Sequence, residues 1–152
     1  MNKLLLLLPF LLPLQSCSDA EATSPVPQME YQVLHDIEYN EYANITNKST
    51  LLIRSQSDYE AELLKRTSDK AKSIDFESES ILLVDMGTQT SGGYGISITV
   101  SENDDYILAN ITYQFPGTGC AVTLALTNPT KVIKFETTKY VLINESITYS
   151  SC

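Results

Sequence analysis

Short runs of alternating apolar residues, separated by turn-forming residues, dominate the chain from Ile74 onwards. In residues 95–100 the apolar side chains occupy every second position, and in residues 106–115 they do so five times in succession: Ile107, Ala109, Ile111, Tyr113 and Phe115. A period of two predicts strands with one buried face. Turn signals at intervals of about 8–12 residues indicate many short strands. The sequence therefore predicts a mainly β fold, an antiparallel β-sandwich or partly open barrel.

Further strands are expected on both sides of this region. Residues 81–87 form a nearly continuous apolar run, which is typical of a central strand. Residues 121–127 alternate again, which predicts a strand with inward-facing Val122, Leu124 and Leu126. The other predicted strands are residues 31–39, 51–55, 131–136 and 140–144.

One short helix is predicted after the second of these strands. Ser57 and Glu60 have the S-x-x-E spacing of a capping box. Tyr59, Leu63 and Leu64 would share one face, and the sequence places Lys65 and Arg66 in the last turn, where positive charge is favourable. We expect this helix to pack on a sheet.

The first 17 residues predict export and lipid anchoring. Lys3 precedes an apolar run, residues 4–14, that is too short to span a bilayer as a helix. The letters LQSC at residues 14–17 resemble a bacterial lipobox, which implies removal of residues 1–16 and acylation of Cys17; an ordinary signal peptide is the alternative. The expected location is the bacterial cell envelope, and Ser18 favours the outer membrane.

Residues 17–29 are small, acidic and proline-rich, which predicts a flexible tether before a single domain at 30–152. The formal net charge of the chain is −9, and loss of Lys3 makes it more negative. Because an acidic chain repels phosphates and anionic head groups, we expect no nucleic-acid partner and membrane contact through the lipid anchor alone.

Two cysteines remain once Cys17 is acylated. Cys120 and Cys152 form an even pair in an oxidising compartment, which favours a disulfide; two free thiols are the alternative. The bridge would close a loop of about 30 residues and contribute about 3–4 kcal/mol on the chain-entropy model.

The chain offers little for catalysis. His35 is its single histidine, so the usual histidine clusters for metals are missing and Cys120 has one candidate base at most. No serine lies in a G-x-S-x-G elbow, and SGGYG lacks the spacing of a phosphate-binding loop. We therefore expect no catalytic residue, no metal and no cofactor.

Two segments resemble the C-terminal domain of the PrcB family: LLVDMGTQTSGGYGISI at residues 82–98 and FPGTGCAVTLALTNPTKVIKF at residues 115–135. The resemblance covers residues 74–136. The residues that match are Gly87, Gly92, Gly93, Tyr94, Pro116, Gly119, Cys120, Thr123, Ala125, Leu126, Thr127 and Pro129. Ser91 replaces the usual threonine, and Thr130 stands where an aromatic residue is frequent.

The PrcB family is named for a lipoprotein subunit of a cell-surface protease complex. The resemblance implies a non-catalytic accessory lipoprotein that stabilises or docks another envelope protein, such as a protease. A purely structural lipoprotein is one alternative. Another is a protease inhibitor, because the loop at residues 90–95 is similar to the T-T-G-[YF] loop that chagasin-type inhibitors carry on an immunoglobulin-like sandwich.

The glycine-rich loop at residues 90–95 is expected to link two adjacent strands, with glycines that permit a positive φ or a close approach of backbone. Tyr94 is either a core plug or an exposed binding anchor. The candidate contact residues are Ser91, Gly92, Gly93, Tyr94, Pro116, Gly117 and Gly119.

Overall fold

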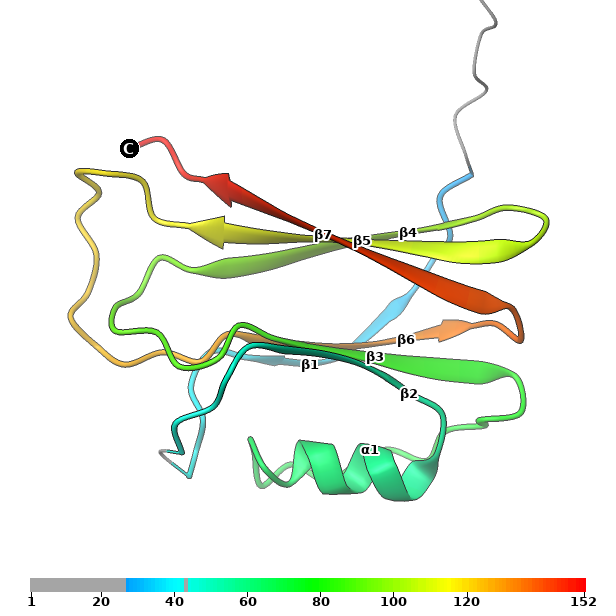
Figure 1. The fold of residues 1–152 in the computed structure, drawn as a ribbon. Helices are drawn as coiled ribbons and strands as arrows, with labels where there is room; N and C mark the ends of the chain where they lie inside the picture. The colour runs from blue at the N-terminus through cyan, green and yellow to red at the C-terminus, as the bar shows by residue number, and fades with distance from the viewer. Residues whose placement is uncertain (1–26, 43) are drawn as a thin grey trace, which may run out of the picture.

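The computed structural model describes residues 27–42 and 44–152, which form two β-sheets packed face to face with one helix on the outer face of the first sheet (Figure 1). The first sheet has the order β1-β6-β3-β2 and the second β4-β5-β7. The strands are β1 (Gln32–Ile37), β2 (Ser49–Ile53), β3 (Glu79–Asp85), β4 (Gly95–Glu102), β5 (Tyr106–Phe115), β6 (Thr130–Glu136) and β7 (Tyr140–Tyr149), and the helix is α1 (Gln56–Leu63). The predicted β-sandwich with one short packed helix is confirmed.

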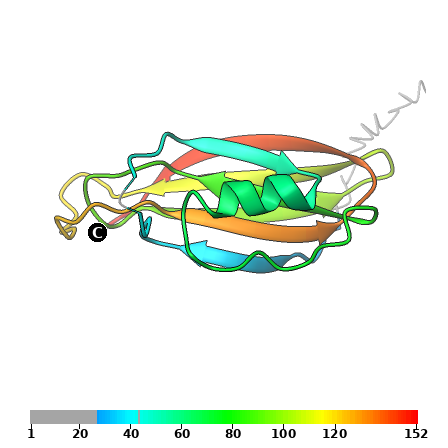
Figure 2. The ribbon, with the colours of Figure 1, turned by 90° about the horizontal axis from the view of Figure 1, so that it is seen from below.

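The continuous apolar run of β3 reflects burial on both faces. Leu82 and Val84 point into the core between the sheets, whereas Ile81 and Leu83 point toward α1. There they pack with Tyr59 and other apolar residues of a second cluster. Figure 2 shows α1 lying over the outer face of the first sheet, with its axis roughly along the strands. Burial of an apolar run on both faces is what places β3 in the centre of a sheet.

The sheets are antiparallel except at one pair. Four strand pairs are antiparallel, but β5 and β7 run parallel. The chain leaves β5, crosses to the first sheet as β6, and returns as β7 beside β5 in the same direction. Similarly, the glycine-rich loop connects β3 and β4, which lie in different sheets, so the expectation that it links adjacent strands is wrong.

Residues 121–127 are a loop, and the strand predicted there is wrong. Leu124 is 95% exposed and Leu126 is 66% exposed, although the alternation placed both inward. Thr123 and Thr127 hydrogen-bond to the glycine-rich loop at isolated points, without a continuous ladder. Alternation describes side-chain direction only, and a strand also needs a neighbour that satisfies its backbone along its length.

The helix begins two residues earlier than the predicted capping box. Ser55, in extended backbone conformation, is the N-cap, and its Oγ accepts a hydrogen bond from the Asp58 amide (3.2 Å). Ser57 therefore lies inside the helix. Lys65 and Arg66 lie beyond its end, because the chain turns after Leu63.

The N-terminal predictions fall mostly outside the described residues. This applies to the signal peptide at 1–16, to Cys17 and to most of the tether at 17–29. Residues 27–29 are described and contact the domain, since Gln28 pairs with Ser101 and Met29 packs against the core. The domain therefore begins before residue 30. In the described part of the chain, no helix is long and apolar enough to cross a membrane.

Candidate binding surface at the loop end

Three connections meet at one end of the sandwich (Figure 1). They join β1 to β2, β3 to β4, and β5 to β6, and the last of them is residues 116–129. The described chain begins at the opposite end (Figure 1), where Pro27 O accepts a hydrogen bond from Glu102 N (3.3 Å) at the end of β4. We call residues 116–129 the apolar loop, and we extend the name glycine-rich loop to the whole connection from β3 to β4, residues 86–94.

The apolar loop packs against the glycine-rich loop. Gly92 N donates to Thr123 O (3.0 Å), and the backbones of Gln89 and Thr127 exchange two hydrogen bonds of 2.8 and 3.0 Å. A Cβ at Gly93, where φ is +87°, would lie 3.0 Å from Val122 Cγ1. A Cβ at Gly92 would contact the Thr123 hydroxyl. These glycines are needed because the apolar loop approaches their backbone closely.

Tyr94 lies at the edge of the core. Its half-buried ring packs edge-on against Phe115, with 5.3 Å between the ring centroids. The structure therefore gives Tyr94 a packing role and leaves part of its surface open. Of the other predicted contact residues, Gly92 is buried, Ser91, Pro116 and Gly117 are half-buried, and Gly93 and Gly119 are exposed.

The most exposed apolar residues at this end were not among the predicted contacts. Leu124 and Leu126 project from the apolar loop, and Ile45, which is 87% exposed, lies in the connection between β1 and β2. A hollow of about 190 Å³ is lined by Tyr39, Asn40, Asn44, Ile45, Thr88, Leu126, Thr127 and Asn128. One sequence signal was available: residues 116–130 contain no charged side chain in a chain of net charge −9.

A buried polar network fixes the turn that ends the apolar loop. The fully buried Asp85 carboxylate accepts hydrogen bonds from Arg66 Nε (2.7 Å), Asn128 Nδ2 (2.8 Å) and Gly87 N (2.7 Å). The charge is paired and both carboxylate oxygens accept hydrogen bonds, so the network stabilises the backbone at Gly87 and Asn128, where the two loops meet the first sheet.

The predicted disulfide is confirmed. Cys120 and Cys152 are bonded, with a Cα–Cα distance of 5.4 Å. Beside them, Ser150 N donates to Phe115 O (2.9 Å). The bridge thus attaches the apolar loop to the segment that follows β7.

The histidine lies in a structural environment. His35 is buried, and its Nε2 is 3.0 Å from the hydroxyl of Tyr59, which is fully buried beneath α1. Its Nδ1 lies 3.3 Å from Asp69. Burial raises the pKa of Tyr59, so its hydroxyl stays protonated. These contacts join β1 to the helical segment.

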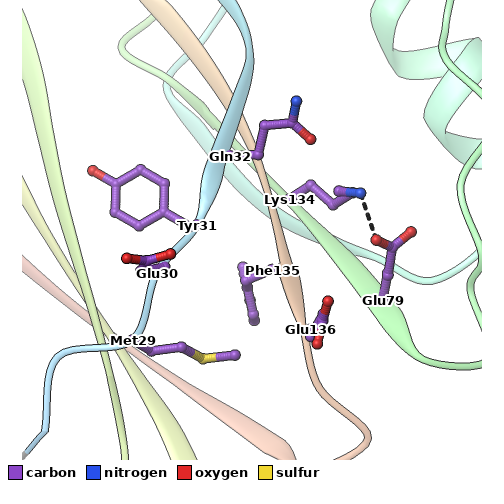
Figure 3. Close-up of a pocket in the computed structure, with 8 residues that line it drawn as sticks. All are labelled: Met29, Glu30, Tyr31, Gln32, Glu79, Lys134, Phe135 and Glu136. Carbon is purple, nitrogen blue, oxygen red and sulfur yellow. Dashed lines mark hydrogen bonds and ion pairs between the residues drawn. The ribbon is translucent and has the colours of Figure 1, made fainter.

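A larger hollow, of about 460 Å³, lies where β1 begins and β6 ends (Figure 3). Met29 and Phe135 contribute apolar surface, and Lys134 is ion-paired with Glu79 (Figure 3). Glu30 and Glu136 also line it. No group of three metal-ligating side chains occurs in the part of the chain that the structure describes.

Comparison with known proteins gives one match. No curated protein and no solved structure matches the chain. The family model described as PrcB C-terminal matches residues 80–136, from β3 through β6, and this span includes both the glycine-rich loop and the apolar loop. The resemblance predicted from the two sequence segments is confirmed: residues 80–136 of this chain match the PrcB C-terminal family model.

Proposed function

We propose that this chain is a non-catalytic, lipid-anchored envelope protein that binds a protein partner through the apolar loop. The observation that carries the proposal is the exposure of Leu124 and Leu126 in an uncharged loop of an acidic chain. Adjacent apolar residues exposed to water are typical of contact surfaces, and the hollow beside Leu126 offers a place for a partner side chain.

The position of the apolar loop supports a protein partner. The described chain begins at the end of the sandwich opposite the loop (Figure 1). If Cys17 carries the acyl chains, the tether holds that end nearest the membrane and directs the apolar loop away from it. An accessory role toward another envelope protein, such as a protease, agrees with what the PrcB family name implies.

Protease inhibition is the second candidate function. It is favoured by the gathering of three connections at one end of a sandwich, which is how a wedge-shaped inhibitor would present its loops (Figure 1). The cover of the apolar loop over Gly92 and the packing of Tyr94 against Phe115 favour the accessory role instead. An inhibitor would lower peptide hydrolysis by the captured protease, whereas an accessory subunit would leave it unchanged or raise it.

The test is capture of partners from the solubilised envelope with the full chain as bait. Leu124→Gln should lose the captured proteins, because the exposed leucine is the proposed contact. Leu64→Gln is the matched control, since Leu64 is an exposed leucine on the helical side of the molecule. We expect Leu64→Gln to capture the same proteins as the wild type. Equal capture by all three proteins would overturn the proposal.

The anchor is tested separately. Cys17→Ser should abolish incorporation of labelled palmitate into the full chain. Continued incorporation by this variant would overturn the lipid anchor at Cys17.

A further inference from the structure

The outer edges of three strands are shielded against pairing with another strand. Along β4, the carbonyls of three alternate residues accept hydrogen bonds: Ile96 from Lys131 Nζ (3.1 Å), Ile98 from the Tyr31 hydroxyl (2.8 Å) and Val100 from Met29 N (2.8 Å). The edge strand β1 has a register shift between Val33 and His35, and β2 has only five residues. Short strands, irregular register and covered backbone all blunt sheet edges.

Within residues 27–42 and 44–152, the remaining edge, β7, has none of these protections. It is ten residues long and keeps an unbroken register with β5 over its whole length. It contains no proline and no lysine, and all its residues except Val141 are exposed. In the described residues, no hydrogen bond reaches the β7 backbone from outside its own sheet. A long, regular and open edge is a template for another strand.

The charge of β7 permits a second copy of the same strand as the occupant. Glu145 is its single charged residue, and Lys48 of the same chain pairs with it at 2.5 Å. Thr50 Oγ1 and the Tyr113 hydroxyl donate to the same carboxylate. Two copies can therefore approach at this edge without bringing an unpaired charge to it.

We propose that β7 pairs antiparallel with β7 of a second copy around a twofold axis, giving one sheet of order β4-β5-β7-β7-β5-β4. The self-complementary register is centred on Asn144, because two opposed carboxamides can each donate and accept a hydrogen bond. This register places Val141 opposite Ile147. A register centred on Glu145 would oppose two carboxylates, which is unfavourable.

The β7 edge runs along the side of the sandwich, and its end at Tyr149 lies near the apolar loop, to which the Cys120–Cys152 bridge connects it. Asn144, where the pairing is centred, lies in the middle of the strand. The pairing therefore does not depend on the proposed partner. The Cys120–Cys152 bridge holds the segment just beyond β7 in place, which keeps the end of the edge against β5.

A cysteine introduced at the twofold axis tests the pairing in the full chain within the envelope. Directly opposed residues of an antiparallel pair have Cβ atoms about 4.5–5.5 Å apart, so Asn144→Cys should form a disulfide-linked dimer that disappears on reduction. Asn110→Cys is the matched control. Asn110 lies beside Asn144 on β5, and its carboxamide bonds to Asn144. With strands about 4.8 Å apart, the two copies of residue 110 would be about 14 Å apart and should not cross-link.

The mass of the detergent-solubilised full chain gives a second measurement. The wild type and Asn110→Lys should be dimers, whereas Asn144→Lys should be monomeric because two lysines would face each other. Both substitutions remove the same side-chain hydrogen bond. The proposal is overturned if Asn144→Cys stays monomeric, if it cross-links to a protein of different mass, or if Asn144→Lys leaves the mass unchanged.

Discussion

Gly93 and Gly119 have almost the same backbone conformation in different surroundings. Their φ angles are +87° and +89°. A Cβ at Gly93 would lie 3.0 Å from Val122 and 3.3 Å from Pro116, whereas a Cβ at Gly119 would have no atom within 4 Å. A substitution at Gly119 therefore measures the free-energy cost of a left-handed backbone alone. A substitution at Gly93 adds the cost of displacing the apolar loop.

We expect Gly119→Ala to lower the free energy of unfolding by about 1 kcal/mol, because the alanine is strained at a positive φ. Gly93→Ala should cost about 2–3 kcal/mol, because it adds overpacking against Val122 and Pro116. Urea unfolding of both variants measures the difference. Equal costs would mean that the apolar loop moves aside freely and does not rest on the glycine-rich loop.

At the scale of elements, α1 shows how a local motif is decided by its context. Both Ser55 and Ser57 are suitable caps, and Ser57 has the better sequence motif because Glu60 follows it by three residues. The structure uses Ser55, since β2 ends at Ile53 and the chain turns directly into the helix. Asp58 occupies the third position after that cap, where its carboxylate is 2.6 Å from Ser55 Oγ.

Ser55→Ala should therefore lower the free energy of unfolding by about 1 kcal/mol, because the Asp58 amide loses its acceptor. Ser57→Ala should change it by less than about 0.5 kcal/mol, because Ser57 is an exposed residue within the helix. Thermal unfolding of the two variants gives the comparison. A larger effect at Ser57 would contradict the observed start of the helix.

At the scale of the whole molecule, Glu145 joins the two sheets. It lies on β7 and bonds to Lys48, which precedes β2, and to Thr50 within β2. Partial burial opposes ionisation, but hydrogen bonds from Lys48, Thr50 and Tyr113 outweigh it and hold the pKa of Glu145 below its ordinary value of 4.5. Burial also raises the pKa of the Tyr113 hydroxyl, so this hydroxyl stays protonated and donates to Glu145.

A carboxylate whose pKa is lowered by folding stabilises the protein above its ordinary pKa, and this contribution is lost as the pH falls through the lowered value. The free energy of unfolding of the wild type should therefore exceed that of Glu145→Gln at pH 7, and the difference should shrink below about pH 4. In a chain that also carries Lys48→Met, the effect of Glu145→Gln on the free energy of unfolding at pH 7 should be smaller. Denaturant unfolding at pH 7 and below about pH 4 measures both free energies. The same difference between the wild type and Glu145→Gln at both pH values would contradict the prediction.

Much of the fold could be predicted from the sequence because strand period, apolar runs and turn residues are local properties. The strand at residues 106–115, the doubly buried strand near residue 82 and the pairing of Cys120 with Cys152 all agree with the structure. The resemblance at residues 80–136 agrees with the family-model match. The glycine-rich loop and the turn at residue 116, both singled out from the sequence, lie at the same end of the sandwich.

The remaining features depend on which segments become neighbours in space, and a local pattern does not contain that information. Residues 121–127 alternate like a strand, yet no strand of the described part of the chain lies beside them to complete a ladder, so Leu124 and Leu126 are exposed to solvent. Gly92 and Gly93 have their role because the apolar loop crosses them. The open edge of β7 likewise exists because the chain returns parallel to β5, and in the described residues no further strand lies outside it. The sequence by itself determined the strands and their spacing, and the tertiary structure decided which backbone and side chains were left without partners.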